Sequence, residues 1–84
     1  DLGKMNWEDA KKACADLGGG WRIPKKEEGK ILVENKKKIG GWDGSYYWSS
    51  TEAKTTGVFW TWTPFGGYER RNNNTNSASV RAVR

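Results

Sequence analysis

The sequence has one cysteine and no histidine. The single thiol, Cys14, cannot form a disulfide within the chain, and without His the usual Cys and His ligand sets for zinc cannot be assembled. The same absence removes the commonest general base and the Ser-His and Cys-His nucleophile pairs. We therefore expect neither a metal nor another cofactor, and we expect that the chain is not an enzyme.

Long apolar runs are also missing. No stretch approaches the roughly 18 apolar residues of a transmembrane helix, and the N-terminus lacks a signal-peptide pattern. Membrane insertion is therefore not expected. Because Asp1 begins the chain without an initiator Met, the sequence is compatible with a piece of a longer protein.

Acidic residues are outnumbered, with 10 Asp and Glu against 15 Lys and Arg and a net charge of +5. This balance favours anionic partners such as nucleic acid, anionic glycans or membrane headgroups. A solvated basic surface explains it equally well, because the longest basic run, residues 36–38, falls at the end of a predicted helix, where cations suit the helix dipole. Nucleic acid is not expected as a partner.

Aromatic residues are abundant for so small a chain. Only 35% of the 84 residues are hydrophobic, yet six are Trp, three Tyr and two Phe. A single domain, residues 1–84, has room for a small core only, so we expect some of these rings to be exposed. Exposed aromatic residues commonly anchor binding interfaces.

The first half predicts two helices. Residues 6–17 form an amphipathic pattern with Asn6 as the cap, and residues 26–38 form a second helix that Gly40 and Gly41 end. The apolar faces are predicted from Trp7, Ala10, Cys14 and Leu17 in the first helix and from Ile31, Leu32, Asn35 and Ile39 in the second. Gly29 should weaken the second helix, and either close packing or a tolerated defect would account for it.

The second half predicts short strands and turns, because helix formers give way to Tyr, Trp, Thr, Val, Gly and Asn. Strands are expected at residues 45–50, 58–63, 68–71 and 79–84, with a polar loop at 72–76. Residues 68–71 should fold back on 58–63 as a hairpin. The chain thus predicts an α+β domain, with a two-helix part at about 5–39 and a strand and loop part at about 42–84.

Four blocks of sequence resemble a bacterial and phage family. They are Trp7-Glu8-Asp9-Ala10 with Cys14, Gly18-Gly19-Gly20-Trp21-Arg22-Ile23-Pro24, Tyr47-Trp48-Ser49-Ser50-Thr51-Glu52, and Val80-Arg81-Ala82-Val83-Arg84. In this order they resemble the C-terminal domain of the Legionella collagen-like adhesin and the Fibrobacter-type paralogous surface domains. The resemblance implies a C-type-lectin-like fold, with two helices followed by a small antiparallel sheet, and a location on a cell surface, in the secreted fraction or on a phage particle.

The sequence departs from the family at two places that matter. Lys25 stands where Thr usually caps the second helix and Gly29 where Leu is usual, so that helix is expected to start late or fray. Ala82 stands where some relatives have a Cys that could pair with the helix Cys, which fits a free buried thiol at Cys14. By the same family comparison, Trp7, Trp21 and Trp48 are expected in the core.

The resemblance extends to the variable proteins of diversity-generating retroelements, whose diversified stretch lies between two of these blocks. Here that stretch is residues 52–79, and its Asn-rich part is what adenine-directed mutagenesis would leave. An ordinary polar loop explains the same Asn residues, because Asn tolerates turn conformations. Both interpretations remain open.

Binding is the function that the sequence favours, through side chains that lie between the family blocks. The predicted surface is aromatic, amide-rich and basic, like an antibody paratope. Its predicted ligand-binding residues are Tyr46, Lys54, Trp60, Trp62, Tyr68, Arg70, Asn72, Asn73, Asn74 and Asn76. Trp60 and Trp62 share one strand face and are expected to be at least partly exposed, with Phe59 as the alternative core residue.

Three hypotheses about partners follow. The first is a recognition module for a protein or glycan ligand on a cell surface. The second is an adhesin domain that binds polyanions such as sulfated glycans through Lys and Arg. The third is a structural tip or oligomerisation domain, for which a trimer would be characteristic.

Overall fold

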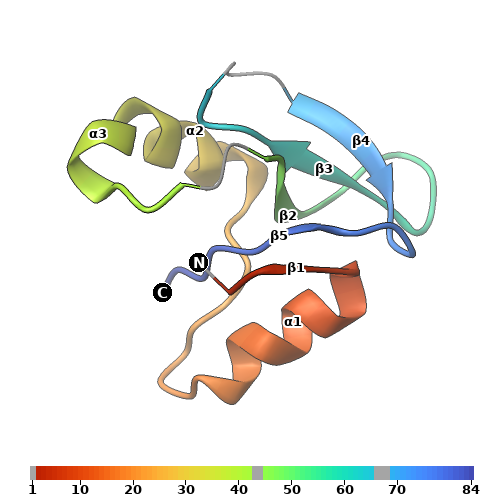
Figure 1. Ribbon diagram of the computed structural model, residues 1–84. Helices are drawn as coiled ribbons and strands as arrows, with labels where there is room; N and C mark the ends of the chain where they lie inside the picture. The colour runs from red at the N-terminus through yellow and green to blue at the C-terminus, as the bar shows by residue number, and fades with distance from the viewer. Residues whose placement is uncertain (1, 43–44, 66–68) are drawn as a thin grey trace.

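The computed structural model describes residues 2–42, 45–65 and 69–84. In chain order the elements are β1 (Lys4–Met5), α1 (Trp7–Asp16), α2 (Lys26–Glu34), α3 (Lys36–Ile39), β2 (Tyr47–Glu52), β3 (Val58–Trp62), β4 (Glu69–Asn73) and β5 (Ala78–Ser79) (Figure 1). Apart from β1, the helices precede the strands, so the predicted α+β class is confirmed. The sequence did not predict β1, because a two-residue strand carries no detectable periodicity.

The sheet has five strands in the order β1-β5-β2-β3-β4. The predicted hairpin is confirmed, since β3 and β4 pair antiparallel from Val58 opposite Asn73 to Trp62 opposite Glu69. The pairing of β2 with β5 is parallel and consists of one pair, Tyr47 and Ser79. The sheet is therefore mixed, whereas the sequence predicted an antiparallel one.

Helix α1 begins where the sequence predicted. The side chain of Asn6 accepts a hydrogen bond of 2.9 Å from the backbone N–H of Asp9, which satisfies a free donor of the first turn. Ala10 and Cys14 are buried as expected. Leu17, however, is 51% exposed, because it is the C-cap residue and lies beyond the last helical turn that faces the sheet.

One core lies between α1 and the sheet. Its buried residues are Ala10, Cys14, Ile23, Trp48, Phe59, Ala78 and Val80. Trp7 completes it by stacking on Phe59, with ring centroids 4.0 Å apart and planes at 11°. The indole Nε1 of Trp7 donates to the carbonyl of Ser49 at 3.1 Å, so this ring is fixed at both its face and its edge.

A second cluster lies on the opposite face of the sheet, under α2. Tyr47 and Trp62 are opposite each other on β2 and β3, and their rings stack with centroids 4.9 Å apart. Gly29 of α2 packs on this pair, since a Cβ built at Gly29 would lie 2.9 Å from the Trp62 ring. Close packing therefore explains the glycine that the sequence left unexplained.

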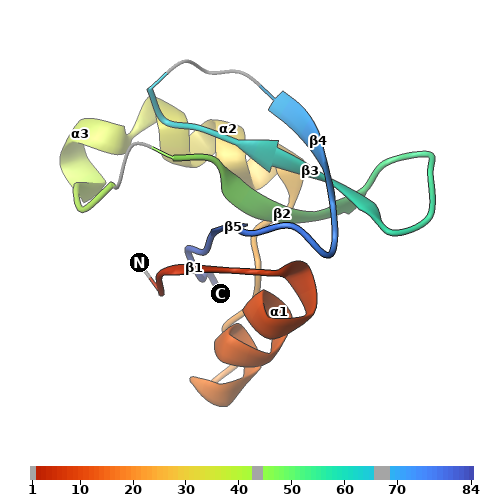
Figure 2. The same ribbon diagram turned by 45° about the vertical axis from the view of Figure 1, so that its right-hand side comes forward.

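Because helices cover both faces of the sheet, the predicted exposure of Trp62 is wrong. Trp62 is 3% exposed, and Phe59, on the other face of the same strand, is buried as well. Figures 1 and 2 show α1 and the α2–α3 pair on opposite sides of the strands. Trp60 is half-buried, as expected, with the ammonium of Lys26 4.3 Å from its ring centroid.

The apolar face predicted for the second helix is also wrong. Ile31 is 59% exposed and Ile39 is 42% exposed, whereas Gly29 is the buried residue of α2. The close approach at Gly29 sets the rotation of the helix and turns Ile31 outward. The helix then stops at Asn35 and resumes as α3, so Ile39 does not continue the face of α2.

Helix α2 begins at Lys26, with no late start. The N–H of Lys26 donates to Oγ1 of Thr51 at 3.0 Å, and the N–H of Lys25 donates to the Glu28 carboxylate at 2.7 Å. A hydroxyl from β2 and a carboxylate from the first turn of the helix therefore act where a Thr cap was expected from the resemblance.

The end of the chain joins the sheet to the connector that precedes α2. The last strand was expected at 79–84, but β5 covers only Ala78 and Ser79. Further on, Arg22 and Val83 exchange two backbone hydrogen bonds of 2.8 Å. This bridge holds Trp21 half-buried beside Arg84, whose guanidinium carbon lies 4.8 Å from the Trp21 ring centroid.

Candidate functional site

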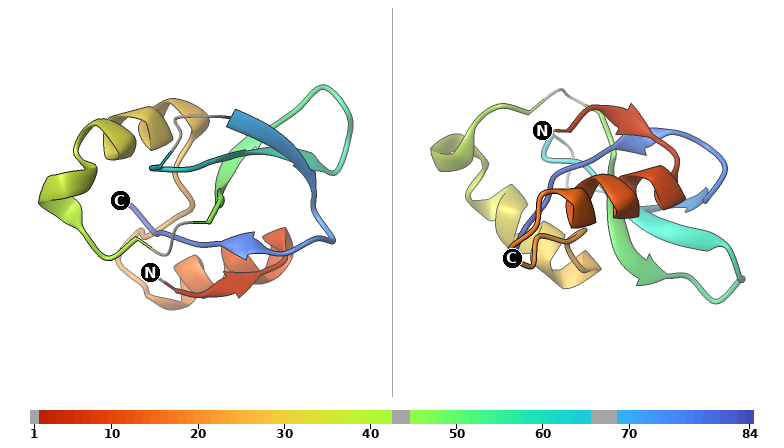
Figure 3. Two further views of the ribbon diagram at one scale, coloured as in Figure 1. Left: turned by 45° about the horizontal axis from the view of Figure 1, so that its top comes forward. Right: turned by 90° about the horizontal axis from the view of Figure 1, so that it is seen from below.

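A concavity of about 430 Å³ opens between the β1–β5 pair and the β3–β4 hairpin. We call it the cleft. It is lined by Lys4, Ser45, Tyr46, Thr61, Arg70, Arg71, Asn72, Ser77 and Ala78. Figure 3 shows β4 and the β1–β5 pair on either side of β2.

The sheet topology explains why a cleft forms at this place. Within the described residues, one strand pair, Tyr47 and Ser79, joins β2 to β5, so the backbone ladder between the two halves of the sheet is short. The N–H of Ser79 donates to the carbonyl of Tyr46 at 2.9 Å, which fixes Tyr46 at the junction. Small side chains at Thr61 and Ala78 leave the space between the two walls open.

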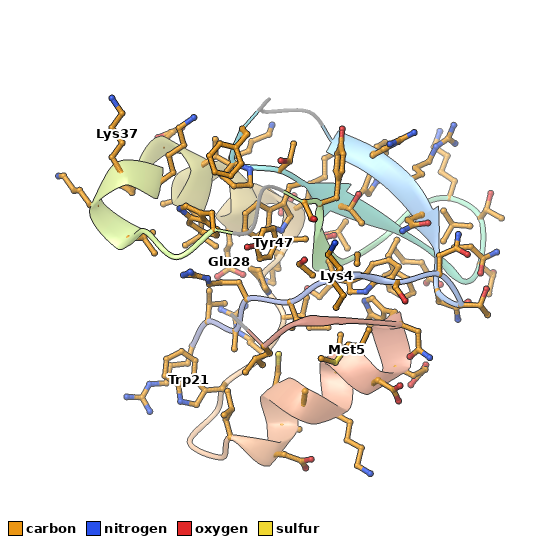
Figure 4. The ribbon with its side chains drawn as sticks, viewed as in Figure 1. Lys4, Met5, Trp21, Glu28, Lys37 and Tyr47 are labelled. Atoms are coloured by element: carbon orange, nitrogen blue, oxygen red, sulfur yellow. The ribbon has the colours of Figure 1, made fainter. Side chains whose placement is uncertain are left out.

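The charge of the cleft has one sign. Of the lining residues that the structure describes, Lys4, Arg70 and Arg71 are cationic and none is acidic. Lys4 belongs to β1 and Arg70 to β4, so the cations come from opposite walls of the cleft. Figure 4 shows Lys4 rising from β1 toward the strands of the hairpin.

Arg70 is positioned by its neighbours on the hairpin. Thr61 is opposite Arg70 in the β3–β4 register, and its hydroxyl donates to the Arg70 carbonyl at 2.9 Å. The guanidinium carbon of Arg70 lies 5.4 Å from the ring centroid of Tyr46. The cation–π contact restrains the side chain while its N–H groups remain available to a ligand.

Arg71 contributes to the cleft differently. It is opposite Trp60 in the register, whereas Arg70 is opposite Thr61, and successive side chains of a strand leave opposite faces. Arg71 therefore belongs to the rim of the cleft, and Lys4 and Arg70 to its walls.

The Asn-rich segment is an ordered turn, with its first two residues in β4. Asn73 Oδ1 accepts hydrogen bonds from the N–H and hydroxyl of Thr75, at 3.1 and 2.9 Å. Asn76 Nδ2 donates to Asn72 Oδ1 at 2.9 Å. This bond uses the amide oxygen of Asn72 and leaves its amide N–H groups as donors at the cleft.

The cleft brings together three of the residues predicted from the sequence, namely Tyr46, Arg70 and Asn72. Asn73, Asn74 and Asn76 lie beside it in the turn and outside its lining. Lys54 is exposed in the loop between β2 and β3. Tyr68 lies outside the described residues.

Trp60 and Trp62 lie away from the cleft. Thr61 lines the cleft, so the residues on either side of it point to the face that α2 covers. Trp62 is buried there against Tyr47 and, edge to face, against Trp42 at 5.8 Å. Its expected place on the ligand surface is therefore wrong.

Several residues of the cleft were missed in the sequence. Lys4 is the most important of them, because it supplies the cation of the opposite wall. Its strand, β1, has only two residues and pairs with β5. Lys4 is opposite Ser79, which lies 75 positions further along the chain. No local pattern signals so distant a pairing.

Two further arginines, Arg22 and Arg81, have partners outside the cleft. Arg22 forms a two-point ion pair with Glu28, at 2.6 and 2.8 Å. Arg81 donates to the carbonyl of Gly40 at 2.8 Å, and its guanidinium carbon lies 4.1 Å from the Trp42 ring centroid. Both arginines therefore make structural contacts away from the cleft.

The Arg22–Glu28 pair changes the ionisation of both groups. Hydrogen bonds from the Arg22 guanidinium and from the Lys25 N–H lower the pKa of Glu28 to about 2. The hydrogen bond to Glu28 raises the pKa of Arg22. Both groups are therefore charged at neutral pH.

Catalytic candidates are not gathered at the cleft. Cys14 is buried under α1, and burial raises the pKa of its thiol. Within the described residues no group of three or more His, Cys, Asp or Glu side chains gathers to hold a metal.

Two smaller hollows flank Trp21, and both are mainly apolar. One, of about 310 Å³, includes Leu2 and the exposed Leu17. The other, of about 360 Å³, includes Trp7 and Ile23. Unlike the cleft, neither contains any of the residues predicted to bind ligand.

Comparisons with known proteins add no family assignment. No protein-family model matches the chain, and no curated protein matches it. Among the residues that the structure describes, no helix is long and apolar enough to cross a membrane.

Proposed function

We propose that the chain is a non-enzymatic ligand-binding module with a C-type-lectin-like fold, and that the cleft receives a protein or glycan ligand. The observation that carries the proposal is the convergence of Tyr46, Arg70 and Asn72 with Lys4 around one concavity. These residues come from three separate segments of the chain, and their side chains offer an aromatic ring, an amide and two cations. Such a combination is typical of recognition surfaces.

The resemblance to bacterial and phage surface domains supports the same proposal. Two helices and a small sheet with a parallel contact between β2 and β5 are compatible with a C-type-lectin-like fold. On this proposal the chain acts at a cell surface, in the secreted fraction or on a phage particle.

The proposed diversified segment overlaps the cleft. Six of the nine lining residues fall between residues 52 and 79, namely Thr61, Arg70, Arg71, Asn72, Ser77 and Ala78. A diversity-generating retroelement acting on this segment would vary most of the cleft while Lys4 and Tyr46 stayed constant. The nucleotide sequence tests this idea: adenine-directed differences from a nearby template repeat are expected, and their absence would leave an ordinary loop.

The test of the binding proposal uses two cleft variants and one control. Tyr46→Ala and Arg70→Ala should remain folded and lose binding to whichever ligand is found on an array of defined glycans or in a displayed peptide library. Lys37→Gln, on the exposed surface of α3, should bind like the wild type. Binding that survives both cleft substitutions in folded protein would contradict the proposal.

Polyanion binding is the second candidate, and the three cations of the cleft favour it. Its probe is heparin, with binding measured at about 50 mM and about 150 mM salt. Charge-driven binding should weaken steeply over this range, whereas binding through Tyr46 and Asn72 should change little. A trimer in light scattering that binds neither heparin nor any array ligand would instead support the structural tip domain.

A further inference from the structure

The hollow of about 360 Å³ beside Trp21 is bordered by α1, by the connector that precedes α2 and by β2. We call it the indole hollow. It shares no lining residue with the cleft, and Figure 4 shows Trp21 on the side of the molecule away from the β3–β4 hairpin. Its volume is within the range of small-molecule sites, which begins at about 300 Å³. Its lining residues are Trp7, Lys11, Ala15, Trp21, Arg22, Ile23, Lys25 and Ser50.

The α1 wall of the indole hollow is held in place by the core. Residues 7, 11 and 15 are spaced four apart, so they lie on one face of the helix. The ring of Trp7 stacks on Phe59 at 4.0 Å, and its Nε1 donates to the carbonyl of Ser49 at 3.1 Å. Because Phe59 covers one face of this ring, the ammonium of Lys11, 5.6 Å from the ring centroid, lies over the other face.

The connector wall is also held in place. Arg22 exchanges two backbone hydrogen bonds of 2.8 Å with Val83, and the guanidinium carbon of Arg84 lies 4.8 Å from the Trp21 ring centroid. Trp7 and Trp21 therefore have separate ring partners, and neither indole fills the hollow by stacking on the other. A ligand that enters a site with two fixed walls loses little binding energy to ordering them.

The charge around this apolar surface indicates what the ligand carries. Three of the lining residues are cationic and none is acidic. Arg22 is neutralised by Glu28, at 2.6 and 2.8 Å, whereas Lys11 and Lys25 form no salt bridge with a described residue. Two unpaired ammonium groups beside indole rings complement an apolar ligand that has a negative charge.

From these observations we infer that the indole hollow binds a small organic acid with an aromatic body. Its rings lie against Trp7 and Trp21, and its carboxylate meets Lys11 and Lys25. Indole walls suit flat rings, which gain from offset or edge-to-face contact in addition to their burial. The hydroxyl of Ser50 offers the carboxylate a further donor. This site is separate from the cleft, so the inference does not depend on the proposed function.

The experiment is a titration of the isotope-labelled protein with sodium naphthylacetate, followed by NMR at constant ionic strength. Saturable shifts are expected at the indole N–H groups of Trp7 and Trp21 and at the amide of Ala15, with a dissociation constant of about 1 mM. Naphthylacetamide keeps the rings without the charge, and acetate keeps the charge without the rings. Each should bind at least about tenfold more weakly than naphthylacetate.

Substitutions on α1 and the connector locate the carboxylate. Lys11→Gln and Lys25→Gln should each weaken naphthylacetate binding about three- to tenfold and leave naphthylacetamide binding unchanged. Lys12→Gln removes the same charge from an exposed position of α1 outside the lining, and should bind like the wild type. Equal weakening by all three would indicate general charge attraction and would overturn the inference.

A fourth substitution blocks the hollow without disturbing the core. Ala15 is exposed, so Ala15→Glu should leave the fold intact while its carboxylate takes the place of the ligand's, and naphthylacetate binding should be lost. Lys12→Glu puts the same side chain on α1 outside the lining and should still bind. Binding that survives Ala15→Glu would contradict the inference.

Three further results would also overturn it. Naphthylacetamide that binds as tightly as the acid would remove the role of the anion and would favour a neutral aromatic side chain of a protein partner. Shifts centred on Thr61 and Arg70 would place the probe in the cleft. A dimer in light scattering that Ala15→Glu converts to a monomer would show that a second copy of the chain covers the hollow.

Discussion

Gly29 is the residue at which α2 packs directly on the Trp62 ring of the sheet. A methyl group added there would lie 2.9 Å from two atoms of the Trp62 ring. Trp62 cannot move aside easily, because it is stacked on Tyr47. The contact therefore fixes both the depth and the rotation of α2.

Gly29→Ala should destabilise the protein, although the same change at an exposed helix position stabilises by about 1 kcal/mol. We expect a loss of about 1–3 kcal/mol from overpacking, measured by denaturant unfolding. Lys30→Ala, at the next and exposed position, is the control and should change stability little. A more stable Gly29→Ala variant would show that α2 does not rest on Trp62.

Glu28 predicts how stability depends on acid. Its pKa falls from 4.5 to about 2 in the folded protein, so the carboxylate contributes stability above its unfolded pKa. That contribution is lost as the pH falls through the folded value. The exposed position limits it to about 1 kcal/mol or less.

Glu28→Gln should therefore lower the melting temperature at neutral pH and have a much smaller effect near pH 2, where the wild-type carboxyl is itself becoming protonated. The measurement is thermal unfolding across this pH range for both proteins. If the melting temperatures of the two proteins differed by the same amount at every pH, the lowered pKa of Glu28 would be contradicted. Glu27→Gln, an exposed neighbour on the same turn, is a matched control.

At the scale of single residues, the sequence predicted which side chains share a face of β3, but it did not predict which faces are buried. Alternation along β3 correctly grouped Trp60 with Trp62 and opposed them to Phe59. It could not show that both faces are covered, because that depends on α2 approaching from a segment about 30 residues away. The small residue that permits the approach, Gly29, has no signature beyond its low helix propensity.

Among the elements, α2 depends on a strand that follows it in the chain. Its first N–H donates to Thr51 of β2, and the preceding N–H donates to Glu28. Without the strand, the helix would have one cap instead of two. Formation of α2 and its docking on the sheet are therefore coupled.

Thr51→Val removes the hydroxyl and keeps the shape of the side chain. We expect a loss of about 1 kcal/mol, the usual effect of removing a helix cap, in denaturant unfolding. Thr56→Val, in the exposed loop between β2 and β3, is the control for the added methyl group. If both variants lose the same amount, the hydrogen bond to Lys26 contributes nothing.

The elements that sequence reasoning found are those with local signals. Asn6 capped the predicted first helix, and the alternation of residues 58–63 indicated β3. The two-residue strand β1 gave no such signal, and β5 was expected at 79–84 instead of Ala78–Ser79, yet these two strands build one wall of the cleft. For that reason the sequence identified Tyr46, Arg70 and Asn72 but not Lys4.

At the scale of the whole molecule, the net charge of +5 is largely unpaired. Among the described residues the salt bridge that forms is Arg22–Glu28, and Lys37 and Lys38 are exposed on α3. Repulsion among the remaining cations opposes the compact state, and salt screens it. The molecule should therefore become more stable as salt is raised from a low concentration.

Thermal unfolding at neutral pH should show a rise of a few degrees between about 10 mM and about 150 mM sodium chloride. Lys38→Glu reverses one exposed charge and should reduce this rise. Lys38→Arg keeps the charge and should behave as the wild type. A melting temperature that falls with salt would mean that favourable charge pairs outweigh the repulsion.

The single thiol of Cys14 can report how often the core opens. It sits in the core between α1 and the sheet, and burial raises its pKa, so a thiol reagent can reach it only when α1 lifts away. The labelling rate, divided by that of an unfolded control, should equal the fraction of time for which α1 is open. A ligand in the cleft that left this rate unchanged would show that the cleft and the core under α1 open independently, whereas a slower rate would show that filling the cleft stabilises the packing of α1.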